Sequence, residues 1–290
     1  MIARGSSVGK LVAARSLSAK FGRAKKEQTT ESPVAPGVTS STTSNKAVVK
    51  GSIVTDVNKF TKILVRHFQD KADTDRAFEM KRYMREQFDY YGLPNPVRTS
   101  AFSDAFTEAK LDTAPISKEF VHEFARVCME SKYREMHYSW LSVLNAKQAK
   151  HVLSEDLLPL LEKYNIFGKW WDITDSLAGL FGQIFLQDPK LHAKKNEEYI
   201  THENMWMRRI ALIHQLRYKE KTNVQMLWDN INKTKHEKEF FIRKAIGWAL
   251  REYSKTDPKA VKAFIQGPDG QGLSPLSVRE GMKVMLRKKD

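Results

Sequence analysis

Apolar residues recur at helical spacing along most of this 290-residue chain. Near the start of the pattern, Val57, Phe60 and Leu64 fall three or four positions apart, which places them on one face of a helix. Similar stretches follow to the C-terminus, and alternating strand patterns are nearly absent. The pattern predicts an all-α body over residues 52–290.

Several residues have the chemistry that begins or ends a helix. Asp73 or Thr74 can cap a helix over residues 75–91, and Gly92 and Pro94 are expected to end it. Two further capping signals are Ser117 and Asp257, and a proline follows the second at the first helical position.

An internal repeat is visible in the second half of the chain. Similar helices begin near the aromatic residues Trp171, Trp206 and Phe241, which are 35 positions apart. The strings "WMRRIAL" and "FIRKAIG" align with basic residues in register, including Arg208 with Arg243. A period of this length predicts an α-solenoid of HEAT-like helix pairs, with a concave face that the basic residues could line. The alternative is that regular helix lengths produced the spacing by chance.

The first fifty residues differ from the body in composition. Residues 1–26 are rich in Arg, Ser and Ala and contain no acid, which is typical of a mitochondrial transit peptide. The alternative is a basic arm that contacts DNA or directs the protein to the nucleus. Residues 27–51 are rich in Ser and Thr and contain no aromatic residue, so they predict a disordered linker ahead of the helical domain.

The net charge and the number of possible metal ligands limit the functions to be considered. The net charge is +15, and +8 remains without the seven basic residues of the first 26, so a polyanionic partner is expected. A basic but merely solvated surface is the other interpretation. The single cysteine and the scattered histidines predict no metal site and no cofactor, and no apolar run reaches the length of a membrane span.

The string "KWWDITDSLAG", residues 169–179, contains the strongest candidate chemistry. Asp172 lies in the first turn of the helix predicted here, where the helix dipole favours a carboxylate, so its position has a structural explanation. Asp175 lies one turn after Trp171, on the same face, and is required neither for capping nor for packing. A salt bridge from Asp175 to an arginine on the next helix is the structural alternative.

Two further residues fit a nucleic-acid site. Arg209 follows Trp206 by one helical turn and could present its guanidinium to a phosphate, and Trp248 interrupts a core-like helix. Each alone suits a structural role. Together on a basic solenoid they suggest aromatic faces for sugars and bases and an arginine for phosphate.

The strings "KWWDITDSLAG", "NMWMRRIALIHQLRYK" and "FFIRKAIGWALREYSKTDP" closely resemble the AlkD-like family of DNA alkylation repair glycosylases, which are built from HEAT-like repeats. The resemblance covers about residues 55–290. It implies a C-shaped, metal-free α-solenoid with a basic concave face, which holds duplex DNA as a monomer. It also implies hydrolysis of the N-glycosidic bond of cationic N3- and N7-alkylpurines, in base excision repair.

The resemblance assigns roles to individual residues by motif. It makes Asp175 the catalytic carboxylate, which stabilises the oxocarbenium-like sugar and orients water. Trp171 and Trp248 flank the sugar and the lesion, Arg209 contacts phosphate, and Tyr83 is a lesion-side aromatic. Pro94 stands where some members carry a polar residue, so a DNA contact from its loop is not expected. The alternative function is a non-catalytic nucleic-acid-binding repeat scaffold.

Overall fold

The structure is a computed structural model that describes the backbone of residues 47–287 and the side chains of residues 57–286. The predicted transit peptide and most of the predicted linker lie outside the described residues. Helix α1 (Ala47–Gln69) begins before residue 51, so the last residues of that linker are helical instead. The described helices, residues 47–287, belong to one compact unit.

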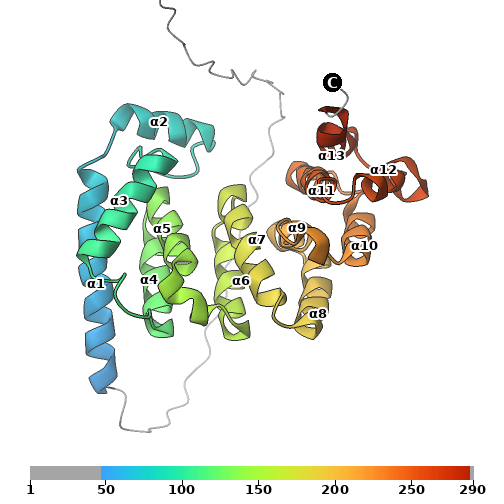
Figure 1. Ribbon diagram of the computed structural model, residues 1–290. Helices are drawn as coiled ribbons and strands as arrows, with labels where there is room; N and C mark the ends of the chain where they lie inside the picture. The colour runs from blue at the N-terminus through green and yellow to red at the C-terminus, as the bar shows by residue number, and fades with distance from the viewer. Residues whose placement is uncertain (1–46, 288–290) are drawn as a thin grey trace, which may run out of the picture. The chain divides into compact units, whose positions relative to one another are not determined.

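Within residues 47–287 the chain forms α-helices joined by short loops and 3-10 turns, and it forms no β-strand (Figure 1). The remaining α-helices are α2 (Thr74–Tyr83), α3 (Asn95–Glu108), α4 (Lys118–Glu130), α5 (Arg134–Asn145), α6 (Leu158–Phe167), α7 (Trp171–Phe185), α8 (Pro189–Ile200), α9 (Met205–Ile213), α10 (Val224–Thr234), α11 (Phe240–Tyr253), α12 (Pro258–Gln266) and α13 (Pro275–Arg287). The 3-10 turns are η1 (Lys147–Val152), η2 (Glu155–Leu157), η3 (Lys219–Lys221) and η4 (Pro268–Gly270). The all-α prediction is confirmed.

The helices stack in two rows, as in an α-solenoid. One row consists of α3, α5, α7, α9, α11 and α13, and each of these helices contacts the next. In the other row, α4, α6, α8, α10 and α12 each pack on the following helix of the first row. Figure 1 shows this order as a continuous change of colour from the first helix to the last. Because each helix pair contacts mainly the pairs before and after it, the hydrophobic core runs continuously along the stack.

The predicted repeat corresponds to this stacking. Helices α7, α9, α11 and α13 begin at Trp171, Met205, Phe240 and Pro275, which are 34 or 35 residues apart. The expected periodicity therefore reflects real structural units. The basic residues in register have a different role from the one expected, because Arg208 bonds to the Glu237 carboxylate and Arg243 to the carbonyl of the same residue.

The predicted capping residues begin the helices expected of them. Asp73 accepts a hydrogen bond from the Arg76 amide at the start of α2, and Ser117 accepts one from the Phe120 amide at the start of α4. Asp257 caps α12 in the same way. Each cap satisfies an amide that the helix itself leaves without a partner.

The predicted helix over residues 75–91 is wrong at its C-terminal end, because α2 stops at Tyr83. The buried carboxylate of Glu135 on α5 accepts the backbone amides of Tyr91, Gly92 and Leu93 at 3.0–3.2 Å. Those amides cannot also bond within a helix, so this segment runs along α5 instead. A tertiary contact overrides the local helical pattern here.

The core consists of the apolar faces that the spacing predicts. Val57, Phe60 and Leu64 are buried, as are Ile173 and Leu177 on α7. In the part of the chain from residue 47 to residue 287, no helix has the length and apolar composition needed to cross a membrane.

Candidate active site

A cavity of about 1070 Å³ lies between α2, α3, α5, α7 and α11. Its walls contain carboxylates, aromatic rings and arginines. The side chains that matter for chemistry are Tyr83, Arg82, Arg98, Tyr138, Trp171, Asp172, Asp175, Arg217 and Trp248. Four of the five residues predicted from the sequence line it, so segments far apart in the chain converge on one site.

Helix α7 has a different role on each side. Ile173, Leu177 and Phe181 are fully buried and fix the helix in the core. Trp171 and Asp175 lie one turn apart on the opposite side and face the cavity. The division predicted for this helix is therefore confirmed, and core packing sets the direction in which Asp175 points.

Asp175 forms a two-point ion pair with Arg209 of α9. The guanidinium donates to Oδ1 from Nε at 2.7 Å and to Oδ2 from Nη2 at 2.9 Å, and its Nη1 donates to the carbonyl of Phe241 at 2.5 Å. Arg209 is only 4% exposed, whereas the Asp175 side chain keeps 18% of its surface open. This planar pairing fixes the orientation of the carboxylate while leaving one side of it facing the cavity.

Asp172 forms a second, deeper ion pair. The fully buried Arg134 of α5 donates to both of its carboxylate oxygens at 2.7 and 2.8 Å, and also to the carbonyl of Gly168. The Tyr138 hydroxyl donates to the same carboxylate at 2.5 Å. These bonds to two side chains of α5 tie the start of α7 to that helix.

The Asp175 carboxylate lies in an environment that resists ionisation. Burial raises the pKa of Asp175 above its ordinary range, the bonds from Arg209 oppose that shift, and the charge of Asp172 adds to it. Burial and the Asp172 carboxylate also raise the pKa of the Tyr138 hydroxyl well above its ordinary range. Tyr138 is consequently a poor acid at neutral pH.

Aromatic rings from the helices α2, α5, α7 and α11 line the cavity. Tyr83 is 74% exposed, and its ring lies edge-on to that of Trp171, with centroids 6.3 Å apart and planes at 83°. Trp248 of α11 is half-buried and also lines the cavity. Trp206, in contrast, is buried against Trp170 and Phe241, so it belongs to the packing between repeats.

Arg209 differs from the arginines that line the cavity. Arg209 does not line the cavity, and its donors bond to Asp175 and a carbonyl, which is the structural alternative considered for Asp175. Its predicted phosphate contact stays a prediction. Sequence reasoning missed Arg82, Arg98 and Arg217, which do line the cavity, because no motif separates them from the other basic residues.

Comparison with known proteins agrees with this geometry. Residues 64–285 match the family model of the DNA alkylation repair enzymes. The chain belongs to the DNA alkylation repair enzyme family. A solved structure of a predicted DNA alkylation repair enzyme from Enterococcus faecalis is 31% identical, covers 73% of this chain and 95% of its own, and superposes with a TM-score of 0.65. No curated protein matches the chain.

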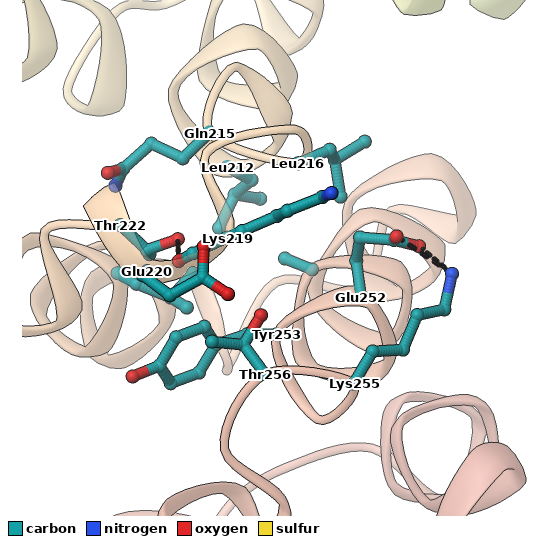
Figure 2. Close-up of a pocket in the computed structure, with 12 residues that line it drawn as sticks. Leu212, Gln215, Leu216, Lys219, Glu220, Thr222, Glu252, Tyr253, Lys255 and Thr256 are labelled. Atoms are coloured by element: carbon teal, nitrogen blue, oxygen red, sulfur yellow. Dashed lines mark hydrogen bonds and ion pairs between the residues drawn. The ribbon is translucent and has the colours of Figure 1, made fainter.

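A second cavity helps to locate the chemistry of this DNA repair protein. It has a volume of about 270 Å³ and lies among α9, η3, α10 and α11. Figure 2 shows Glu252 and Lys255 paired at its edge, and the Thr222 hydroxyl bonded to the Lys219 carbonyl. Its lining contains no tryptophan and no aspartate. The cavity that contains Asp175 is therefore the better candidate for repair chemistry.

The described residues also bear on metal binding. From residue 57 to residue 286, no three His, Cys, Asp or Glu side chains gather as a metal-binding group. Asp172 and Asp175 bond to arginines instead.

Proposed function

We propose that the protein is a DNA glycosylase that hydrolyses the N-glycosidic bond of cationic N3- and N7-alkylated purines in duplex DNA. The observation that supports this most directly is Asp175, a carboxylate at a cavity wall, fixed by Arg209 and accompanied by Trp171 and Trp248. Membership of a DNA alkylation repair family supplies the substrate polymer and the type of damage.

The proposed reaction requires one well-placed negative charge. The bond between C1′ of the sugar and N9 of the alkylated purine breaks, its electron pair goes to the purine, and the cationic base departs as a neutral molecule. The positive charge passes to the sugar, where Asp175 stabilises it electrostatically and the indole faces by cation–π attraction. Water then attacks C1′ and loses its proton to Asp175 or to solvent, leaving an abasic site.

The cavity favours lesions that leave without being protonated. Tyr138 already donates its proton to Asp172, and burial raises the pKa of Tyr138 and of Tyr90 well above the ordinary range. Neither phenol is suited to act as a general acid at neutral pH. A base that already carries a positive charge needs no such acid, whereas a neutral base such as uracil does.

Binding of duplex DNA is proposed to rest on the positive charge of the chain. Arg82 and Arg217 are exposed at the cavity that contains Asp175, and the chain has a net charge of +15. Guanidinium groups bind phosphate oxygens in pairs, which would position the strand but read no sequence. We therefore expect damaged sites to be recognised by the charge of the lesion rather than by the neighbouring bases.

The decisive experiment is release of free bases from methylated duplex DNA by the wild type and by Asp175→Asn. The substitution keeps the shape of the side chain and removes its charge. If the carboxylate supplies about 3–4 kcal/mol of transition-state stabilisation, the rate falls roughly 10²–10³-fold. Asp229→Asn, an exposed aspartate on α10, is the matched control and should keep the wild-type rate.

Two results would contradict the proposal. One is an Asp175→Asn variant that releases 7-methylguanine as fast as the wild type. The other is a wild type that releases uracil as readily as 7-methylguanine. Salt-dependent DNA binding with no release of 3-methyladenine or 7-methylguanine would instead support a non-catalytic repeat scaffold.

A further inference from the structure

The cavity combines two features that recognise different parts of one nucleotide. The first feature is aromatic: the rings of Tyr83 and Trp171 lie at 83° to each other, and Asp175 lies one helical turn from Trp171. Perpendicular aromatic faces with a nearby carboxylate are suited to an alkylated cation. Tyr83 is 74% exposed, so its ring is accessible to a ligand.

The second feature of the cavity is a set of guanidinium groups available to an anion. Arg82 and Arg217 are exposed at the cavity, and neither forms an ion pair with any residue between 57 and 286. Arg98 also lines the cavity, but its guanidinium donates to the Asn95 side chain at 2.8 Å. Exposed guanidinium groups such as those of Arg82 and Arg217 bind phosphate.

The charges of the cavity argue against either half of a nucleotide as a sufficient ligand. Asp172 and Asp175 each pair with a buried arginine, and the rest of the lining contains one carboxylate, Glu79, and three arginines. The lining as a whole is therefore positively charged, which disfavours a lone cation. A lone phosphate, in turn, gains nothing from the aromatic rings. A ligand that carries a cationic ring and a phosphate together matches both features.

Resting on the proposed function, we propose that this cavity binds a single N7-alkylated purine mononucleotide as a free ligand, without duplex DNA. The alkylated ring lies against Tyr83 and Trp171. The 5′-phosphate contacts the exposed arginines of the cavity, Arg217 and Arg82. The recognition unit is then one zwitterionic nucleotide, and the rest of the duplex adds affinity without adding selectivity. The cavity volume of about 1070 Å³ is ample for such a ligand, since small-molecule sites occupy roughly 300–1,000 Å³.

The test measures binding of four ligands to the full chain in the absence of DNA. They are the 2′-fluoro forms of 7-methyl-dGMP, dGMP, 7-methyldeoxyguanosine and deoxyguanosine, which separate the cation from the phosphate. The fluorine slows hydrolysis and allows binding to be followed by ¹⁹F NMR beside calorimetry, at about pH 6, where the methylated ring keeps its cation. We expect 7-methyl-dGMP to bind about tenfold more tightly than dGMP, and about tenfold more tightly than the methylated nucleoside.

Two exposed residues provide variants that should not disturb folding. Tyr83→Leu should remove most of the preference for the methylated ring, whereas Phe78→Leu should not, because Phe78 is exposed on the same helix but does not line the cavity. Arg217→Gln should remove most of the preference for phosphate. Lys221→Gln, a nearby exposed cation outside this cavity, should retain it.

The outcomes are distinct from those of the excision assay. Equal affinity for the four ligands, or a methyl preference that survives Tyr83→Leu, overturns this inference even if 7-methylguanine is released from DNA. Selective binding of 7-methyl-dGMP that requires Tyr83 and Arg217 supports it even if no base is released.

Discussion

At the scale of single residues, the orientation of Asp175 depends on Arg209. The arginine lies 34 positions away, on the next helix of the row, and holds both carboxylate oxygens. The sequence indicated that both residues matter, but it could not show that they pair. Helical periodicity relates residues three or four apart, and a contact across 34 positions depends on how the repeats stack.

Arg209→Ala should lower excision, and the salt dependence of DNA binding by this variant tests whether Arg209 contacts phosphate. It leaves the largely buried Asp175 without its partner, which we expect to cost about 3 kcal/mol of folding free energy and to release the carboxylate from its orientation. The rate of 7-methylguanine release should fall strongly. Because the guanidinium is 4% exposed, the slope of DNA affinity against salt should stay unchanged.

The dependence of DNA affinity on salt concentration can also contradict this expectation for Arg209→Ala. Loss of about one counterion from the slope would assign Arg209 to phosphate, as the motif implied. Arg217→Gln is the comparison, because Arg217 is exposed at the cavity and should itself reduce the slope.

The pH dependence of excision should report the environment of Asp175. The reaction requires the ionised carboxylate, and burial raises its pKa above the ordinary value of 3.8. As pH falls through this raised pKa the group is protonated, so the rate should decline at a higher pH than a solvated aspartate would give. Excision rates measured between about pH 4 and pH 8, with spontaneous base loss subtracted, check this. A rate that stays constant down to about pH 4 would be the opposite result, and Asp175→Asn should show no decline in this range.

At the scale of elements, α7 and α2 show where sequence reasoning works and where it fails. The two sides of α7 could be predicted because its apolar spacing is purely local. The end of α2 could not, because the segment after it bonds to Glu135, about 43 residues further on. The early stop turns Tyr83 into an exposed residue at the cavity rather than part of a longer helix.

Gly92 is the residue that allows the chain to return against the start of α2. Its φ is +88°, and a Cβ there would lie 2.0 Å from the Asp73 carbonyl oxygen and 2.8 Å from the Ala77 amide nitrogen. Gly92→Ala should therefore destabilise the fold by about 2–4 kcal/mol and displace α2 from the cavity. Denaturant unfolding measures the first effect, and weaker excision at permissive temperature reports the second.

Gly179→Ala is the matched control for that substitution. Gly179 lies inside α7, and a Cβ there would meet no atom within 4 Å. The same chemical change should stabilise the protein by about 0.5–1 kcal/mol, because alanine favours a helix. Similar losses for both variants would show that the geometry around Gly92 is not the cause.

At the scale of the whole molecule, ion pairs tie successive helices of one row together. Arg134 of α5 pairs with Asp172 of α7, Arg209 of α9 pairs with Asp175, and Arg251 of α11 pairs with Glu280 of α13. The period of 35 predicted the stack, since it needs only self-similarity along the chain. The partners could not be predicted, because charged residues are abundant and only the folded stack selects among them. The active-site pair is one member of this series, in which the carboxylate also faces a cavity.

The stability of the whole domain should depend on two buried histidines that do no chemistry. His192 of α8 and His214, which follows α9, share a hydrogen bond with their Nε2 atoms 2.6 Å apart, and His214 also bonds to the Ile210 carbonyl through Nδ1. Burial lowers the pKa of His214 to about 3 and that of His192 in the same direction. Neither imidazole can readily accept a proton while the helices stay packed.

Unfolding exposes these imidazoles to protonation near their ordinary pKa of 6.5. Above that pH neither state binds the proton, so the pair stabilises the fold fully. As pH falls below about 6.5 the unfolded state binds more protons, so the free energy of unfolding should decrease by about 1.4 kcal/mol per pH unit for His214 alone. His214→Gln removes this protonation of the unfolded state. The free energy of urea unfolding should then depend less on pH between about pH 7 and pH 5, however much the substitution destabilises the protein at pH 8. His151→Gln, an exposed histidine in η1, should leave the slope unchanged. If His214→Gln follows the wild-type slope, protonation of the unfolded state at His214 does not govern the acid sensitivity of the fold.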